Sequence, residues 1–316
     1  MKKTSLLIFL ITSLLVSSFA LAYIAFGERA GVLLATIANG VLLGGFYGLT
    51  AMGLSLVFGI TKIINVCHGE FVVLGAYVGY WLAISYGVNP ITLIASFPIL
   101  FVVGLVIGKT LMNRAIKMGI DQPLLVAFGL SLCLRNLMRY LWTATPRGIS
   151  IPMGGLPLSG GTYISYLSLM IFCVSVVGLL SLHLFLKNTF VGKAIRAAGQ
   201  HQESAKLMGI NVDNINALAY ALGLLLAAVA GSLVSLRFSF DPESGSMFLG
   251  RALCAVVLGG VGHILGALAG GMILGVVESI GAFFLGDVMR DAIVFLIFLA
   301  ILLVKPTGLF AKYRAF

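Results

Sequence analysis

Charged residues are scarce in this sequence. Only 9% of its 316 residues are Asp, Glu, Lys or Arg, whereas 60% are hydrophobic. Soluble domains carry about 25% charged residues, and a soluble core has no room for so much apolar surface. The composition therefore argues against an ordinary soluble protein and predicts an exterior that faces lipid.

Motifs for several kinds of chemistry are missing as well. The cysteines, Cys67, Cys133, Cys173 and Cys254, lie far apart without a C-x-x-C pair, which argues against a disulfide framework or a zinc site. No G-x-x-x-x-G-K-[ST] is present, so we expect no ATP site in this chain. H-E-x-x-H and G-x-S-x-G are also absent, so an intramembrane enzyme would lack its catalytic pair. We expect no catalytic residue, no metal and no cofactor in this chain.

The positive charge has the distribution of a membrane protein. The net charge is +10, and the basic residues stand in short breaks between apolar runs. Nucleic-acid-binding proteins instead cluster Lys and Arg on polar faces. The pattern favours contact with membrane lipid and no nucleic-acid partner.

Long apolar runs predict an all-α, polytopic transmembrane helical bundle. A crossing helix needs about 20 apolar residues. We identify ten segments, at 4–26, 31–60, 64–87, 90–110, 122–143, 163–186, 215–236, 247–261, 263–285 and 289–304. The short run 247–261 has two interpretations, a crossing or a half-helix or re-entrant segment buried in protein.

The first segment is ambiguous. Lys2 and Lys3 precede an apolar run that ends in Ala20-Leu21-Ala22, as in a cleavable signal peptide. The uncharged run is nevertheless long enough to span a bilayer. Residues 1–30 are therefore either a retained helix or a signal-like segment whose removal leaves nine crossings. Residues 31–316 form one membrane domain in both cases.

Lys and Arg also predict the orientation. With a cytoplasmic N-terminus and ten crossings, 13 Lys and Arg fall on the cytoplasmic side and 4 on the other. This asymmetry agrees with the positive-inside rule and predicts that both termini are cytoplasmic. The rule favours 247–261 as a crossing, because the basic C-terminal tail would otherwise lie outside.

Glycines recur every fourth residue in several of these segments. Small residues at this spacing form a flat stripe that lets helix backbones approach closely. The sequence therefore predicts close helix packing at four sets of glycines, with sliding or unwinding during transport as a second interpretation. The sets are Gly40, Gly44 and Gly48; Gly75 and Gly79; Gly104 and Gly108; and Gly262, Gly266 and Gly270.

The longest polar break, residues 187–214, is expected on the cytoplasmic side, where a soluble partner can dock. Within it, Glu203-Ser204-Ala205 and then Gly209 are similar to the E-A-A-x-x-x-G pattern of ABC permeases, with Ser at the second position. A short helix with small residues can enter a groove of an ATPase subunit, and Gly209 is expected to end it. The alternative is an ordinary amphipathic connector.

Several polar residues fall inside the apolar segments, where such groups are costly and tend to be functional or paired. We consider Asn39, Asn65, His68, Glu70 and Glu278 as residues of a translocation pathway or as hydrogen-bonded braces between helices. On a helix, Asn65 and His68 would share a face, whereas His68 and Glu70 would point to opposite sides.

Two arginines also fall inside an apolar segment. Arg135 and Arg139 lie four residues apart, so they share one helix face. They are expected to reach the bilayer surface or to contact lipid phosphate.

Five motifs resemble the branched-chain amino acid permease family of ABC importers, the Liv type. The resemblance covers residues 31–310 and is specific because the motifs occur in the family's order. The motifs are Asn65-Val66-Cys67-His68-Gly69-Glu70 for N-F-A-H-G-E; Thr189, Gly192, Ala194, Arg196 and Ala197 for T-x-x-G-x-A-x-R-A; Leu207-Met208-Gly209-Ile210-Asn211 for L-x-G-I-N; Val257 to Gly262 with Gly266-Ala267 for V-L-G-G-x-G-x-x-x-G-A; and Pro306-Thr307-Gly308-Leu309-Phe310 for P-x-G-L-F.

The resemblance implies a permease subunit in the bacterial cytoplasmic membrane that imports branched-chain amino acids by alternating access. It implies two cytoplasmic ATPases that use ATP and Mg, an extracytoplasmic binding protein and a second permease subunit, usually a different chain. Coupling to the ATPases would involve Glu203, Ser204, Ala205, Gly209 and Arg196. Urea, short amides or other amino acids are alternative substrates. A gradient-driven transporter is the alternative mechanism, and it would not need residues 187–214.

Overall fold

The computed structural model describes residues 28–87, 94–119, 121–151, 153–157, 162–305 and 307–310. The first predicted segment, 4–26, lies outside the described residues. The elements are α2 (Glu28–Thr61), α3 (His68–Tyr86), α5 (Ser96–Ile107), the π-helical turn η1 (Gly108–Met112), α6 (Asn113–Met118), α7 (Gln122–Trp142), β1 (Gly155–Pro157), β2 (Tyr163–Ser165), α8 (Tyr166–Asn188), α9 (Phe190–Gln200), α10 (Gln202–Leu207), α11 (Val212–Arg237), α12 (Ser244–Gly259), α13 (Ile264–Leu285), the 3₁₀ turn η3 (Asp287–Met289) and α14 (Arg290–Val304).

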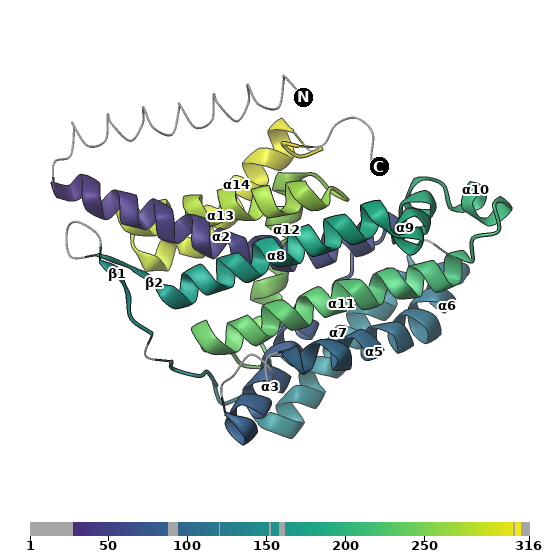
Figure 1. Cartoon of the computed structure of the whole chain (residues 1–316), viewed down its shortest axis with the longest axis horizontal. Coiled ribbons are helices and arrows are strands. Elements are labelled where there is room, and N and C mark those ends of the chain that lie inside the picture. The colour runs from purple at the N-terminus through teal and green to yellow at the C-terminus, as the bar shows by residue number, and fades with distance from the viewer. Residues whose placement is uncertain are drawn as a thin grey trace.

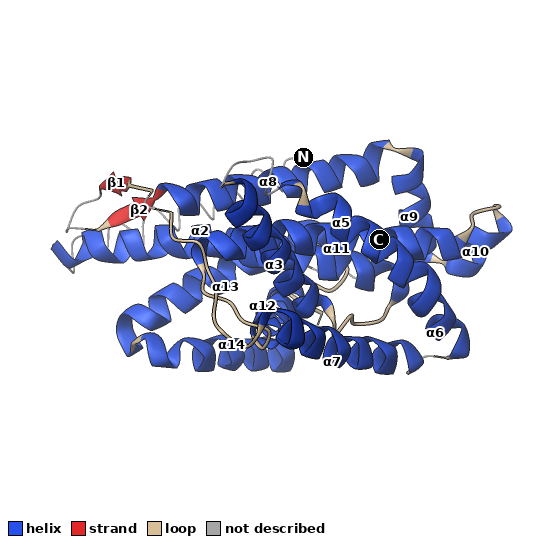
Figure 2. Ribbon diagram, turned by 90° about the horizontal axis from the view of Figure 1, so that it is seen from below, coloured by secondary structure: helices blue, strands red, loops and turns tan. Residues whose placement is uncertain are grey.

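The described chain is an all-α bundle of long, roughly aligned helices, with one small antiparallel hairpin of β1 and β2 at an end (Figures 1 and 2). Six helical stretches are long and apolar enough to cross a membrane: 31–61, 96–118, 122–142, 166–188, 212–237 and 264–285. These spans make the chain a polytopic membrane protein. Ten crossings, as counted from the sequence, are not confirmed.

One predicted boundary differs from the structure. The segment expected at 90–110 is helical from Ser96 through Met118, because η1 and α6 continue α5 without a break. Lys109, Arg114 and Lys117 therefore lie on this helical stretch and not in a loop. Long basic side chains tolerate such a position because their apolar stems can lie along the helix while their charged ends reach water.

The glycine stripes bring helix backbones together as their spacing predicts, except at Gly262, which lies in the turn before α13 with φ +79°. On α2, a Cβ added to Gly44 would lie 2.4 Å from the Cα of Met272 on α13, and one on Gly40 would lie 2.8 Å from the Cα of Val276. Gly75 approaches α11 in the same way, 2.8 Å from the Cα of Ala228. Larger side chains at these positions would force the helices apart, so the glycines set the distance between them.

The short segment predicted at 247–261 corresponds to α12, which runs across the direction of the long helices (Figure 1). Its 16 residues extend about 24 Å, less than the roughly 30 Å of a bilayer core. Before it, the chain turns back into the bundle, where Phe240 is buried against Tyr77, with 5.0 Å between the ring centroids. A full crossing by this segment is not confirmed, and the geometry is that of the half-helix alternative, buried in protein as that alternative requires.

Candidate functional site

The polar segment after α8 is held against the end of α2. Thr189 caps α9 by accepting a hydrogen bond from the Gly192 backbone N–H at 2.9 Å. A Cβ on Gly199 would lie 3.2 Å from the Gly59 carbonyl oxygen, and Gln202 Nε2 donates to the Ile60 carbonyl at 3.0 Å. These contacts give α9 and α10 a fixed position at one end of the bundle (Figure 1).

Helix α10 ends at a glycine with a left-handed backbone. Gly209 has φ +80°, its N–H donates to the Lys206 carbonyl, and the Ile210 N–H donates to the Ala205 carbonyl. This pair of hydrogen bonds is a Schellman cap, which satisfies carbonyls that the helix end would leave unpaired. Asn211 then caps α11 by accepting from the Asn214 N–H at 3.1 Å.

The outer surface of this segment carries large apolar side chains. Phe190, Leu207 and Met208 are 84%, 88% and 82% exposed. Beside them Glu203 accepts a hydrogen bond from Lys206 at 2.8 Å, which raises the pKa of Lys206. Exposed apolar residues grouped with polar ones are typical of a protein interaction site.

The predicted coupling residues divide between the two sides of this segment. Ala205 is buried, whereas Glu203, Ser204, Arg196 and Gly209 are exposed. The sequence analysis did not single out Phe190, Leu207 or Met208 as contact residues. The sequence signal that could have identified them is the presence of three large apolar residues within a polar segment.

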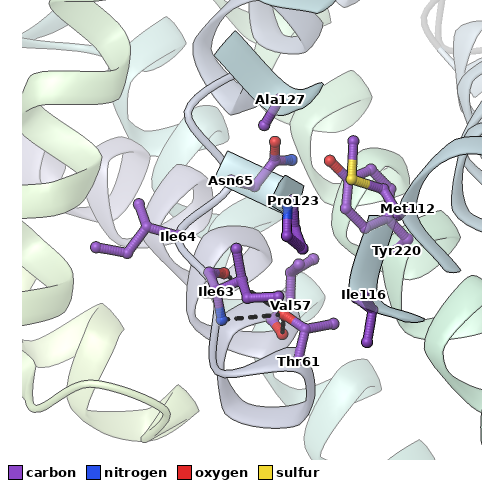
Figure 3. Close-up of a pocket in the computed structure, with 10 residues that line it drawn as sticks. All are labelled: Val57, Thr61, Ile63, Ile64, Asn65, Met112, Ile116, Pro123, Ala127 and Tyr220. Atoms are coloured by element: carbon purple, nitrogen blue, oxygen red, sulfur yellow. Dashed lines mark hydrogen bonds between the residues drawn. The ribbon is translucent and has the colours of Figure 1, made fainter. Parts of the chain in front are cut away.

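Asn65 lies in the bend between α2 and α3, not on a helix, so the predicted helical face shared with His68 does not exist. Its Oδ1 accepts from the Cys67 N–H at 3.2 Å. Asn65 and Tyr220 belong to the group of side chains around one pocket (Figure 3). Asn65 Nδ2 and the Tyr220 hydroxyl are buried without a hydrogen-bond partner among the described residues, so two polar groups remain available beside this pocket.

His68 and Glu70 point toward different helices, as their spacing predicts. The fully buried His68 ring places Nε2 3.0 Å from the Thr50 carbonyl of α2, so Nε2–H is the donor. Glu70, 1% exposed, accepts a hydrogen bond from Arg135 of α7 at 2.7 Å. Together the two residues connect the start of α3 to α2 and to α7.

Arg135 points inward to a buried carboxylate and not to the bilayer surface, whereas the predicted surface role of Arg139, whose side chain is 54% exposed, stays a prediction. Arg135 pairs with Glu70 and lies 3.5 Å from Glu243, and Arg139 pairs with Glu243 at 2.9 Å. The carboxylates come from α3 and from the connection between α11 and α12. This pairing explains why Arg135 can lie partly buried in the protein, since a nearby opposite charge offsets part of the cost of burial.

Glu278 lies in a second ionic cluster, apart from Glu70. It is 1% exposed on α13, 3.5 Å from Arg251 of α12 and 3.9 Å from Arg290 of α14. Arg251 also pairs with Asp291 at 2.7 Å. Asn39 contacts neither cluster in the hydrogen bonds of the described chain, because its Nδ2 donates to the Tyr163 carbonyl in β2 at 3.4 Å.

The polar residues predicted as one group therefore fall into separate places. His68, Glu70 and Asn65 surround the start of α3, whereas Glu278 joins α13 to α12 and α14, and Asn39 contacts the hairpin. Sequence reasoning did not propose Glu243, Arg251 or Tyr220 for any of these sites. Glu243 in particular reads as a loop residue because it follows Asp241-Pro242.

The fold and its ionic clusters define a polytopic α-helical membrane protein whose polar segment, α9 and α10, is structured at one end of the bundle. The chain belongs to the family described as "Branched-chain amino acid transport system / permease component", which matches residues 36–302.

Curated relatives agree with this family. The high-affinity branched-chain amino acid transport permease BraD of Pseudomonas aeruginosa is 32% identical, over 87% of this chain and 95% of that protein. LivH of Escherichia coli K12, with the same description, is 31% identical over 87% of this chain and 94% of its own length. A probable LivH of Methanocaldococcus jannaschii is 29% identical over 83% and 87%. No solved structure matches the chain.

Proposed function

We propose that this chain is the membrane-spanning permease subunit of an ATP-driven importer of branched-chain amino acids. BraD and LivH are branched-chain amino acid transport permeases that align over almost their whole length, and this similarity supports the substrate class. The subunit works by alternating access with two cytoplasmic ATPases, an extracytoplasmic binding protein and a second permease subunit of the same type. This chain has no ATP site of its own, and ATP and Mg are used by the ATPases.

The observation that carries the mechanism is the surface of α9 and α10. Phe190, Leu207 and Met208 are exposed there, on a segment that is capped at both ends and fixed against α2. A connector between two membrane helices gains nothing from exposing these side chains to water. A groove of an ATPase that covers them would bury this apolar area and transmit its movement through Gln202 to the end of α2.

The orientation follows from the same segment. If ATPases dock on α9 and α10, this end of the bundle is cytoplasmic, as the distribution of Lys and Arg also indicates. Both termini are then cytoplasmic, in the cytoplasmic membrane of a bacterium. The chain makes ten crossings with a retained first segment and nine after its cleavage. One of these crossings is made by the 238–243 connection and α12 together.

Among the polar residues, His68, Glu278 and Asn39 act as braces between elements, and Asn65 braces the bend between α2 and α3. Each bonds to or lies near a neighbouring element, except Asn65, which bonds within its own bend. Glu70 instead belongs to a row of alternating charges with Arg135, Glu243 and Arg139 that reaches the surface of the subunit.

The deciding experiment is uptake by the reconstituted complex. The permeases, ATPases and binding protein are placed in liposomes, and entry of labelled leucine and urea is measured with and without ATP. We expect ATP-dependent leucine uptake that is lost in a variant with Gly209→Asp and Glu203→Arg, while the subunits still assemble. Uptake of urea alone would retain the mechanism and refute the substrate. Uptake without any ATPase, unaffected by the substitutions, would instead support a gradient-driven transporter.

A further inference from the structure

Two helices of this protein begin inside the bundle. The first residue of α3, His68, contacts the carbonyl of Thr50, which is eleven residues before the end of α2 at Thr61. At 1.5 Å per residue this is about 16 Å from that end. The start of α12 lies beside it, because a Cβ on Gly69 would be only 2.0 Å from the carbonyl oxygen of Gly245. The N-termini of α3 and α12 therefore meet backbone to backbone deep in the protein.

Four charges of alternating sign lie where these helices meet. From the inside outward they are Glu70, Arg135, Glu243 and Arg139, joined at 2.7, 3.5 and 2.9 Å. Their side chains are 1%, 25%, 48% and 54% exposed in the same order. The row thus leads from a fully buried carboxylate to the surface of the subunit.

The buried end of the row is incompletely paired. Within the described part of the chain, Glu70 Oε2 and Arg135 Nε are buried and have no hydrogen-bond partner. Unpaired groups of this kind are rare in native proteins and call for a further partner. The Glu70 carboxylate lies at the meeting point of the helices, where a Cβ on Gly245 would be 3.2 Å from its Oε1.

The exposed end of the row does not suit lipid. Arg135 is seven residues before the end of α7 at Trp142, which places it about 10 Å inside that end. Glu243, nearly half exposed, lies next to Arg135. A charged side chain at this depth faces water or protein, because contact with hydrocarbon is too costly. The surface where Arg135 and Glu243 meet therefore faces water or protein and not hydrocarbon.

We propose that Arg139, Glu243, Arg135 and Glu70 form a stepped binding site for the zwitterionic head of an α-amino acid at the N-termini of α3 and α12. This inference rests on the proposed import of amino acids. Glu243 and then Glu70 accept hydrogen bonds from the ammonium group of the substrate. The neighbouring arginine guanidinium donates hydrogen bonds to the carboxylate of the substrate. The positive ends of the two helices also favour the substrate carboxylate, as in other transporters with helices that begin at mid-membrane.

This arrangement binds the ammonium and carboxylate groups that all amino acids share and makes no contact that distinguishes one side chain from another. A substrate that exchanges one ion pair for a similar one at each step is never bound in a deep energy minimum. A transport pathway requires this, because the substrate has to leave each position again. Neutral solutes such as urea gain no ion pairs from the site. The row of charges thus selects zwitterions as a class, and the choice among them falls to other components.

The first test is a matched pair of variants in the reconstituted complex. Glu243→Gln removes the exposed carboxylate of the site. Asp287→Asn makes the same chemical change at a carboxylate that pairs with Arg290 at 2.6 Å outside the site. We expect Glu243→Gln to lower leucine uptake per assembled complex about tenfold, since charge-assisted hydrogen bonds are lost. ATP hydrolysis stimulated by the loaded binding protein should stay within about twofold, and Asp287→Asn should leave both unchanged.

A second measurement remains decisive if Glu243→Gln fails to assemble. Ser246→Cys, on the exposed side of α12, is placed in a chain whose exposed native thiol at Cys173 of α8 is retained as an internal control. A charged, membrane-impermeant thiol reagent should label residue 246 and not Cys173, and leucine turnover should slow this labelling. Failure to label residue 246 would overturn the site.

The outcomes also separate this inference from the proposed function. If the wild-type complex imports no amino acid with ATP, the proposed function fails. If it imports leucine and Glu243→Gln does so equally well, only the binding site is refuted. A variant whose uptake and stimulated ATP hydrolysis fall together would assign Glu243 to structure and would also refute the site.

Discussion

The termination of α10 offers a change that alters the backbone and nothing else. Gly209 has φ +80°, and a Cβ added there would meet no atom within 4 Å. Gly209→Ala therefore creates no clash and removes no contact. Its cost is the left-handed conformation, about 1–2 kcal/mol for a residue with a Cβ.

This strain is relieved when the cap at the end of α10 opens. Opening breaks the bonds from Gly209 to Lys206 and from Ile210 to Ala205, and it displaces Leu207 and Met208. If these residues dock on an ATPase with the cap closed, the docked state keeps the whole strain of the left-handed backbone at residue 209. One to two kcal/mol then weakens ATPase binding about 5- to 30-fold.

Gly286→Ala is the matched control. Gly286 has φ +87°, and its added Cβ would also meet no atom within 4 Å. It follows α13, away from α9 and α10. Both variants should lose similar thermal stability, whereas only Gly209→Ala should need more ATPase for half-maximal leucine uptake. Equal ATPase requirements in the two variants would refute the assignment of α10 as the docking helix.

Three further changes test the packing and the buried charges, with the midpoint of thermal unfolding in detergent as the measurement. Gly44→Ala should destabilise the protein by about 1–3 kcal/mol, because its Cβ would lie 2.4 Å from a backbone atom of α13. Gly129→Ala on α7, with no atom within 4 Å of the added Cβ, should be neutral or stabilising. A larger loss of stability in Gly129→Ala than in Gly44→Ala would contradict the packing argument. Arg251→Met should cost about 3–5 kcal/mol because it leaves Glu278 buried without its nearest counter-charge, and adding Glu278→Met should restore most of the loss unless the pair is unimportant. His68→Phe should cost about 0.5–1.5 kcal/mol by removing the hydrogen bond to the Thr50 carbonyl, and His68→Gln, which keeps a donor, should cost less if this bond braces α3 against α2.

Local patterns predicted those parts of the structure that depend on neighbouring residues. The spacing of Gly40, Gly44 and Gly48 predicted a close approach because small residues four apart fall on one helix face. Gly209 predicted a helix end because its backbone reaches φ values that other residues avoid. Both inferences need only a few consecutive turns of the chain.

The ionic clusters were beyond such reasoning. Arg135 was expected to reach the bilayer surface or to contact lipid phosphate, together with Arg139 on the same helix face. Its partners, Glu70 and Glu243, are 65 and 108 residues away in the sequence. The direction of α12 was hidden for the same reason, since contacts at its two ends with Gly69 and Gly266 determine it. Pairings over such distances depend on the completed bundle.

The contact between α2 and α13 also limits how these helices can move. The facing positions on α13 repeat small residues at the interval found on α2, namely Ala267, Gly271, Gly275 and Ser279. A shift of four residues, about 6 Å, would again place small residues opposite small residues. The surfaces thus fix the separation of the two axes but permit several registers. In the present register Arg251 of α12 lies over the Tyr47 ring of α2 at 5.7 Å and beside Glu278 of α13, so it contacts both helices. Any sliding of α2 along α13 would then occur in steps of four residues, and the contacts of Arg251 would favour the present register.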